Sequence, residues 1–205
     1  MKSMIRGIGR ISGLALCVAA TSIAGGQKQA LNNVHTHGSP LLVEDMAGEW
    51  NVKQRMWLGP STEPTALPRA LAHRQSIGGT ILQEQMELAP GEKGDPFTRV
   101  AYFEYNKVTG QYEYFSIDSR APQMMNERSN GDSAEERKDK QPLNLWGGIF
   151  VAPKWGDADN VAFRYRLMIS PVQENRQTVQ LYLIPVSGDP HKEFLAFEYE
   201  YTRRP

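Results

Sequence analysis

Apolar and polar residues alternate with a period of two along most of the chain after residue 45. In the stretch from Trp50 to Leu58, one face of an extended chain carries Trp50, Val52, Met56 and Leu58, and the other carries Asn51, Lys53 and Arg55. Because side chains along a strand point alternately to the two sides of a sheet, this pattern predicts a half-buried β-strand.

The same alternation recurs at short intervals, separated by turn signals such as Gly78-Gly79 and the "KVTG" stretch at 107–110. Further strands are predicted at 69–77, 79–88, 97–106, 111–118, 161–170, 178–186 and 193–203, with weaker candidates at 123–128 and 145–151. About eight to ten short strands with no helical stripe between them are typical of an all-β fold. We predict an antiparallel barrel, closed or nearly closed, like those of lipocalins and fatty-acid-binding proteins.

One strongly polar insert, residues 126–142, interrupts this pattern. Its mixed charges and lack of apolar residues predict a loop. A solvated hairpin tip is the simpler interpretation, and a lid over a barrel mouth is the alternative.

The first 24 residues have the pattern of a secretory signal peptide. A basic start is followed by the apolar run 11–20 and by small residues that would allow cleavage near Ala24. We expect a flexible tether over 25–44 and a single barrel domain over 45–205. The apolar run is too short to span a bilayer comfortably, so we expect no membrane span in the mature chain. The predicted location is the bacterial periplasm or the medium, after signal cleavage.

Composition narrows the possible partners. The 23 basic and 23 acidic residues cancel, and a nucleic-acid partner would normally call for a basic surface. The single cysteine, Cys17, lies in the leader, so the mature domain must fold without a disulfide. Leu16 is larger than the residue that usually precedes a lipid-modified cysteine, which argues against a lipoprotein.

A Gly-x-Trp triplet, Gly48 to Trp50, opens the first predicted strand, and Arg203 lies near the end of the last. In a closed antiparallel barrel the first and last strands pair, which brings these residues together. An Arg guanidinium over an indole ring is a favourable cation–π pair. We therefore assign Gly48, Trp50 and Arg203 a structural role in closing the barrel.

The triplet, together with the final-strand Arg, resembles the calycin arrangement of lipocalins and fatty-acid-binding proteins. A longer pattern is more specific: "GEW", then "SIGGTILQEQ", "FEYNKVTGQYEYFSIDS" and a terminal "FEYEYTR". In this order the stretches are similar to DUF1579, a family of proteins of unknown function, over about residues 46–204. The resemblance implies a lipocalin-like barrel and no particular activity.

The predicted interior is rich in aromatic residues: Phe103, Tyr112, Tyr114, Phe115, Phe163, Tyr165, Phe197, Tyr199 and Tyr201. An ordinary packed core is one interpretation, and a cavity for a small apolar molecule is the other. Tyr112 and Tyr114 are candidate ligand-binding residues. Arg164 and Arg166 share one face of a strand and would clamp an acidic head group if that face points inward. Their more polar surroundings favour the outward orientation.

Candidate catalytic and metal-binding groups are sparse. His35 and His37 would form an incomplete metal site, with no further ligand nearby. His73 and Ser76 have the residue types of a base and a nucleophile, but their odd spacing places them on opposite faces of a strand. Asp118 would be needed to complete a triad, or more simply caps a turn. We assign no catalytic residue, no metal site and no cofactor.

The sequence thus favours an exported lipocalin-like barrel that binds a small apolar or amphipathic molecule without catalysis. Two alternatives remain open: an enzyme that uses the barrel pocket, and a filled barrel with a structural or envelope-interaction role.

Overall fold

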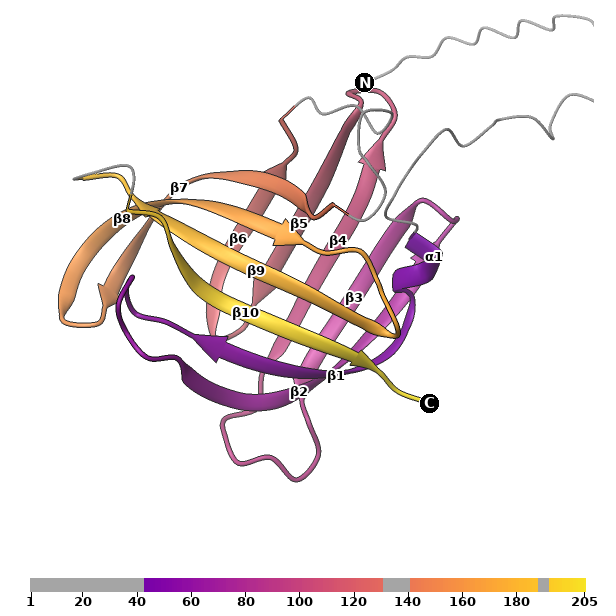
Figure 1. Ribbon diagram of the computed structural model, residues 1–205, viewed down its shortest axis with the longest axis horizontal. Helices are drawn as coiled ribbons and strands as arrows, with labels where there is room; N and C mark the ends of the chain where they lie inside the picture. The colour runs from indigo at the N-terminus through magenta and orange to yellow at the C-terminus, as the bar shows by residue number, and fades with distance from the viewer. Residues whose placement is uncertain (1–42, 131–140, 188–191) are drawn as a thin grey trace, which may run out of the picture. The chain divides into compact units, whose positions relative to one another are not determined.

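The computed structural model describes residues 43–130, 141–187 and 192–205, and these residues form a closed β-barrel (Figure 1). The one helix within this part of the chain is a single turn, α1 (Val43–Met46). The strands are β1 (Gly48–Met56), β2 (Thr65–Ile77), β3 (Ile81–Leu88), β4 (Thr98–Asn106), β5 (Gln111–Asp118), β6 (Ala121–Arg128), β7 (Leu143–Trp155), β8 (Ala158–Ile169), β9 (Arg176–Pro185) and β10 (Phe194–Arg203). Each pairs antiparallel with its neighbours in sequence, and β1 pairs with β10. The predicted all-β antiparallel barrel is confirmed.

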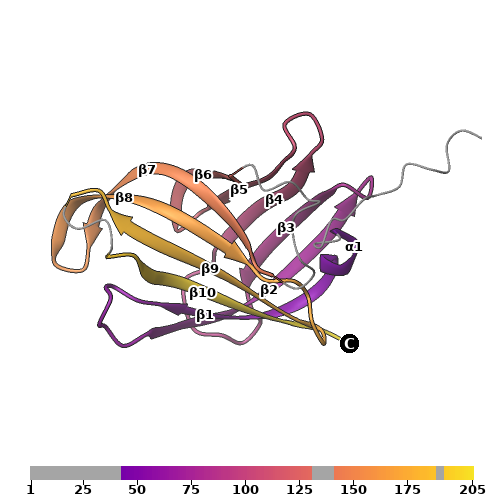
Figure 2. The same cartoon turned by 45° about the horizontal axis from the view of Figure 1, so that its top comes forward.

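The antiparallel order defines two ends of the barrel. Strands β7 to β10 and β1 run across one side and β3 to β6 run obliquely across the other, with the core between them (Figures 1 and 2). One end, here called the plugged end, carries α1, the C-terminus and the turns at 78–80 and 107–110. The opposite end, here called the far end, carries the turns at 119–120 and 156–157.

The barrel closes through direct pairing of the two chain ends. Trp50 lies opposite Arg203 in the β1–β10 register, and the Arg203 guanidinium carbon lies 4.3 Å from the centre of the indole ring. The same guanidinium donates hydrogen bonds to the carbonyls of Ala47 and Asp45, while the Trp50 indole N–H donates to the Met46 carbonyl at 3.0 Å. Indole and guanidinium together fasten α1 across the plugged end.

Gly48 makes room for this arrangement. Its φ of 123° is a conformation that other residues rarely adopt, and a Cβ placed on it would lie 2.6 Å from the Arg203 guanidinium nitrogen Nη1. The guanidinium therefore reaches the backbone of α1 because residue 48 has no side chain. This is the physical basis of the Gly-x-Trp triplet.

The β6–β7 seam is the weakest in the barrel wall. Only two residue pairs join these strands, Glu127 with Gly147 and Arg128 with Trp146. Tyr165 on β8 crosses β7 over Gly147, and its hydroxyl lies 3.2 Å from the backbone nitrogen of Asn126 on β6. The phenol thus adds a connection between β8 and β6 where the backbone ladder is short.

Several local expectations need correction. β1 ends at Met56, so Leu58 lies beyond the strand and is exposed. β2 begins at Thr65, before the predicted start at residue 69. Pro68 has no N–H to donate to β1, and a bulge in the β1–β2 pairing at this point accommodates it. Phe115 was expected inside, but it alternates with buried Tyr114 and packs against Tyr102 on the outer face.

The predicted loop at 126–142 begins too early, because β6 continues to Arg128. The weaker strand candidates at 123–128 and 145–151 are both confirmed within longer strands. The predicted signal peptide and nearly all of the tether, and most of the candidate lid, lie outside the described residues.

Replacing Arg203 by Lys should destabilise the barrel. A lysine retains the charge but cannot donate to two carbonyls while lying flat on the indole, so we expect a loss of about 1–2 kcal/mol. Urea unfolding measures the difference. Arg204→Lys, at an exposed neighbouring position, is the matched control and should change the unfolding free energy by less than about 0.5 kcal/mol. Equal effects from the two variants would contradict this account of closure.

Replacing Gly147 by Ala should strain the weak seam. The added Cβ would lie 2.0 Å from the Tyr165 ring, so ring or backbone must move, at a cost of about 2–3 kcal/mol. Gly148→Ala is the control, because a Cβ there meets no atom within 4 Å. The urea midpoints of the two variants should differ clearly, and coinciding midpoints would show that Tyr165 does not hold this position.

Candidate functional site

Three charged side chains lie buried together inside the barrel: Arg74 on β2, Glu84 on β3 and Arg99 on β4. The Glu84 carboxylate accepts from Arg74 Nε at 2.7 Å and from Arg99 Nη1 at 2.5 Å. We call this group the Arg–Glu–Arg cluster. Removing three charges from water costs several kcal/mol per ion unless the charges are paired, and here each carboxylate oxygen has its own guanidinium partner.

Strand alternation places these charges inside. Arg74 is in phase with Ala70 and Ala72, two buried residues whose small side chains leave room for a guanidinium. Glu84 lies on β3 between buried Leu82 and Met86. The cluster therefore occupies positions that the pattern otherwise fills with apolar residues.

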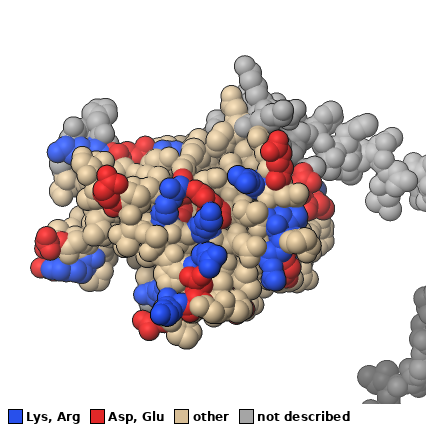
Figure 3. All heavy atoms as spheres, turned by 60° about the horizontal axis from the view of Figure 1, so that its bottom comes forward, with Lys and Arg blue, Asp and Glu red and all other residues tan. Residues whose placement is uncertain are grey.

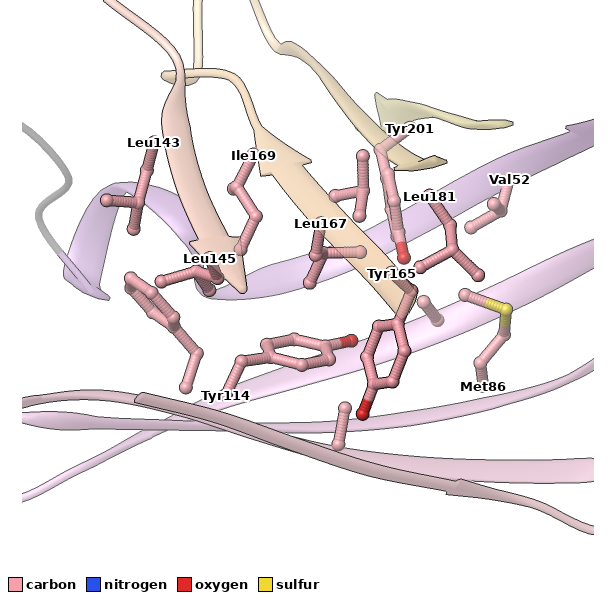
Figure 4. Close-up of a cluster of buried hydrophobic side chains, with 14 of the residues drawn as sticks. Val52, Met86, Tyr114, Leu143, Leu145, Tyr165, Leu167, Ile169, Leu181 and Tyr201 are labelled. Carbon is pink, nitrogen blue, oxygen red and sulfur yellow. The ribbon is translucent and has the colours of Figure 1, made fainter. Parts of the chain in front are cut away.

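Aromatic and amide groups complete the shell around the cluster. Arg99 donates a hydrogen bond to the Tyr114 hydroxyl, and Arg74 donates to the Gln177 side-chain oxygen at 2.5 Å. The Arg74 guanidinium also lies 3.8 Å from the centre of the Tyr201 ring. Tyr114 and Tyr201 both extend into the interior from opposite sides (Figure 4).

The cluster carries a net positive charge. Burial opposes ionisation of Glu84, but attraction to Arg74 and Arg99 outweighs it and holds the pKa of this carboxyl below its ordinary value. Burial also opposes the charge on Arg99, yet the nearby Tyr114 and Glu84 raise its pKa well above the ordinary value. Two cations and one anion therefore remain ionised at neutral pH.

Glu127 is a second buried carboxyl, and it lacks the pairing that Glu84 has. Its side chain is 1% exposed, and its Oε2 atom has no hydrogen-bond partner. Its strand neighbours are Tyr114 on β5 and Gly147 on β7, and a glycine offers no side chain to meet it. Burial raises the pKa of Glu127 to about 8, against a smaller opposing effect of Arg99. The group is therefore mostly protonated at neutral pH.

The space beside the Arg–Glu–Arg cluster is small. A cavity of about 10 Å³ is lined by Arg74, Glu84, Tyr114 and apolar neighbours that include Met46 and Phe103. A volume of this size with polar walls holds about one water molecule. The plugged half of the barrel is thus packed in this state.

The far end differs, because its inward-facing rings are only partly covered. We call Phe150, Trp155, Phe163, Phe194 and Phe197 the far-end aromatic cluster. Trp155 is its centre, with ring centroids 5.4 Å from Phe163, 6.2 Å from Phe197 and 6.4 Å from Phe194. Phe163 and Phe194 are buried, whereas Phe150, Trp155 and Phe197 are half-buried.

A third guanidinium lies at this end. Arg120, in the β5–β6 turn, pairs with Asp118 at 2.6 Å and packs 3.6 Å from the centre of the Phe97 ring. It also contacts the Gln54 side-chain oxygen at 3.4 Å. A fixed, partly exposed cation therefore stands at the end where the aromatic rings are accessible.

The structure separates the four candidate ligand-binding residues. Tyr114 lies beside the Arg–Glu–Arg cluster, while Tyr112 stacks on Phe103 with ring centroids 5.6 Å apart in the apolar core. Arg164 and Arg166 lie on the outer face of β8, where Arg164 is exposed and Arg166 binds Glu193 at 2.8 Å. Only Tyr114 therefore lies among the buried charges.

The outer face carries charges of both signs. Basic and acidic side chains are interspersed on the face drawn in Figure 3. Arg55 on β1, for example, forms ion pairs with Glu198 and Glu200 of β10. These pairs join neighbouring strands and have no connection with the interior cluster.

The remaining candidates are not brought together. His73 lies on the outer face and contacts Glu49 at 2.5 Å, and Asp118 is engaged by Arg120. His35 and His37 lie outside the described residues. Within 43–130, 141–187 and 192–205 no group of three metal-binding side chains occurs, and no helix is both long and apolar enough to cross a membrane.

Comparison with known families gives one match. The family described as "Protein of unknown function (DUF1579)" matches residues 41–203, which include every strand of the barrel. The chain belongs to the DUF1579 family. No curated protein matches it. DUF1579 membership agrees with the resemblance drawn from the sequence, and a lipocalin-like barrel is consistent with the fold.

Sequence reasoning missed the main charged residues of the candidate site in this DUF1579 protein: Arg74, Glu84, Arg99 and Glu127 inside the barrel, and Arg120 in the β5–β6 turn. A signal was present for the first three, since each charged residue is in phase with buried apolar neighbours on its strand. Glu127 gave a weaker signal, because β6 was itself a weak strand candidate.

Replacing Glu127 by Gln should change how stability depends on pH. The carboxyl has an ordinary pKa of 4.5 when unfolded and about 8 when folded, so the folded DUF1579 protein binds more protons between these values. Wild-type stability therefore falls as pH rises through this window, by up to about 1.4 kcal/mol per pH unit from this group. Glu127→Gln removes the titration.

Urea unfolding of both proteins across this pH window measures the effect. The unfolding free energy of the variant, relative to that of the wild type, should increase as pH rises and should level off above about pH 8. Glu113→Gln, on the outer face of β5, is the control and should follow the wild-type profile. A constant difference between Glu127→Gln and wild type would show that Glu127 titrates normally.

Proposed function

We propose that this protein is an exported, non-catalytic barrel that binds a small amphipathic molecule through its far end. The observation that carries the proposal is the far-end aromatic cluster. Inward-facing rings of a filled barrel should be covered, yet three of these five remain half-buried. Ligand sites are typically lined by apolar and aromatic side chains with a few placed polar groups.

The apolar part of the ligand would pack on these rings. Trp155, Phe150 and Phe197 offer faces and edges that are still accessible. Covering apolar area contributes about 25 cal/mol per Å² before the cost of ordering the ligand. A ligand must therefore cover several of these rings for the gain to exceed the cost of association.

The polar part would face the guanidinium groups. Arg120 stands at the same end, and the Arg–Glu–Arg cluster gives the interior a net positive charge. Fixed positive groups favour a head group that carries negative charge or strong hydrogen-bond acceptors. Export is supported by the leader pattern of residues 1–24, which has a basic start, an apolar run and small residues at the cleavage position.

One observation favours a second function, a filled barrel with a structural or envelope-interaction role. The cavity beside the cluster holds about one water molecule, so the plugged half has no room for a ligand without rearrangement. The two functions differ in a simple way, because only the first predicts saturable binding at the far end.

Titration with 1-anilinonaphthalene-8-sulfonate, an aromatic anion that fluoresces in apolar sites, tests the proposal. The wild type should bind it saturably, and Trp155→Leu should weaken binding by about tenfold through lost ring contact. Trp146→Leu is the matched control, since Trp146 lies on the outer face of the neighbouring β7 segment. Circular dichroism verifies that both variants fold.

Two results would count against binding. Absence of saturable fluorescence with the wild type favours the filled barrel. An equal loss of probe affinity in Trp155→Leu and Trp146→Leu would show that the probe does not bind at the far-end aromatic cluster.

A further inference from the structure

Among the residues that the structure describes, Glu127 is the one with a buried side-chain oxygen that has no hydrogen-bond partner. Buried polar atoms in folded proteins are almost always hydrogen-bonded, and a lone exception calls for an explanation. Arg99, the cation whose field acts on Glu127, already donates to Glu84 and to Tyr114. Tyr165 directs its hydroxyl to the backbone of Asn126. The neighbours that could satisfy this carboxyl are thus committed elsewhere.

The position of Glu127 connects it to the far-end aromatic cluster. Its β7 partner is Gly147, and the Tyr165 ring packs over that glycine. The Tyr165 ring centroid lies 5.7 Å from that of Phe150, a half-buried member of the cluster. The Tyr165 ring therefore links the cluster to Glu127, and a ligand seated on the aromatic rings would reach this buried carboxyl by displacing the phenol.

The balance of charge indicates which head group suits this place. With Glu127 protonated, the Arg–Glu–Arg cluster leaves one uncompensated positive charge in the interior. An anionic head group brings the interior to neutrality, whereas an ammonium group adds a second uncompensated cation. A neutral carboxyl can also donate a hydrogen bond to an anion, which an ionised one cannot.

We propose that Glu127 forms an acid-recognition site, in which its protonated carboxyl donates a hydrogen bond to the carboxylate of an amphipathic ligand. The site rests on the proposed binding function and specifies its substrate class as small apolar carboxylic acids. Arg99 supplies the positive field, and the aromatic cluster holds the apolar part. No bond is made or broken.

This assignment predicts a distinctive pH dependence. The groups that face Glu127 are Tyr114 from β5, Arg99 from β4 and Tyr165 from β8, while β7 presents the non-titrating Gly147. Burial raises the pKa of both tyrosines, and the pKa of Arg99 lies well above its ordinary value, so none of the three titrates near pH 8. Loss of carboxylate binding through about pH 8 would therefore report Glu127 itself.

Calorimetric titration of the full chain with octanoate, octylamine and octanol, which share one apolar chain, tests the site. Octanoate should bind at least about tenfold more tightly than octanol near neutral pH, and octylamine no more tightly than octanol. Octanoate affinity should fall by about tenfold per pH unit above pH 8.

Two variants separate Glu127 from a general electrostatic effect. Glu127→Gln keeps a hydrogen-bond donor but cannot ionise, so octanoate binding should persist with a flat pH profile. Glu113→Gln, on the outer face, should retain the wild-type profile.

The remaining outcomes overturn the inference. A pH profile that persists in Glu127→Gln, or a preference for octylamine, would exclude Glu127 as an acid-recognition group. Equal binding of all three compounds would leave the proposed binding function intact and remove only this site. Failure of all three to bind, together with failure of the fluorescent probe, would remove both.

Discussion

Pairing of β1 with β10 is the constraint on which the interior of this protein depends. Once Trp50 and Arg203 meet, the sheet has no free edge, and every inward-facing side chain is confined to one enclosed space. A charged residue on an open sheet can turn toward water, but inside a closed barrel it must find a partner. The Arg–Glu–Arg cluster follows from closure, because Arg74, Glu84 and Arg99 come from adjacent strands and find their partners in one another, in nearby phenols and in the Gln177 amide.

The two ends of the barrel differ in how completely their side chains are covered. The plugged end is closed by a helix turn, an indole and a guanidinium, and the cavity beside the Arg–Glu–Arg cluster admits about one water molecule. The far end keeps aromatic rings half-buried, and the two residue pairs that join β6 to β7 lie toward the plugged end, next to the contact of the Tyr165 phenol with β6. This difference between the two ends is the contrast on which the proposed binding function rests.

The fold could be predicted because both the strand alternation and the closure of the barrel depend on residues that can be recognised in the sequence. Strand positions followed from the period of two, and the pairing of chain ends followed from Gly48, Trp50 and Arg203. The interior site could not be predicted in the same way. Glu84 in "ILQEQMEL" was not predicted to lie inside, although its phase with Leu82 and Met86 places it there. Which residues meet there depends on the register of four strands, which alternation alone does not determine. Arg164 and Arg166 drew attention instead, because two adjacent cations are conspicuous even on an outer face.

The contrast between Glu84 and Glu127 is the strongest argument that the interior has a use beyond packing. Both are buried carboxyls facing the same space, yet one accepts from two guanidinium groups and the other has an oxygen without a partner. A leucine at position 127 would fill similar volume without the desolvation cost, as it does at Leu143 and Leu145 on the neighbouring strand. A barrel selected for stability alone has no reason to keep an acid there. A barrel that must offer a hydrogen bond to an incoming group does, because only a polar atom left free by the fold is available to a ligand.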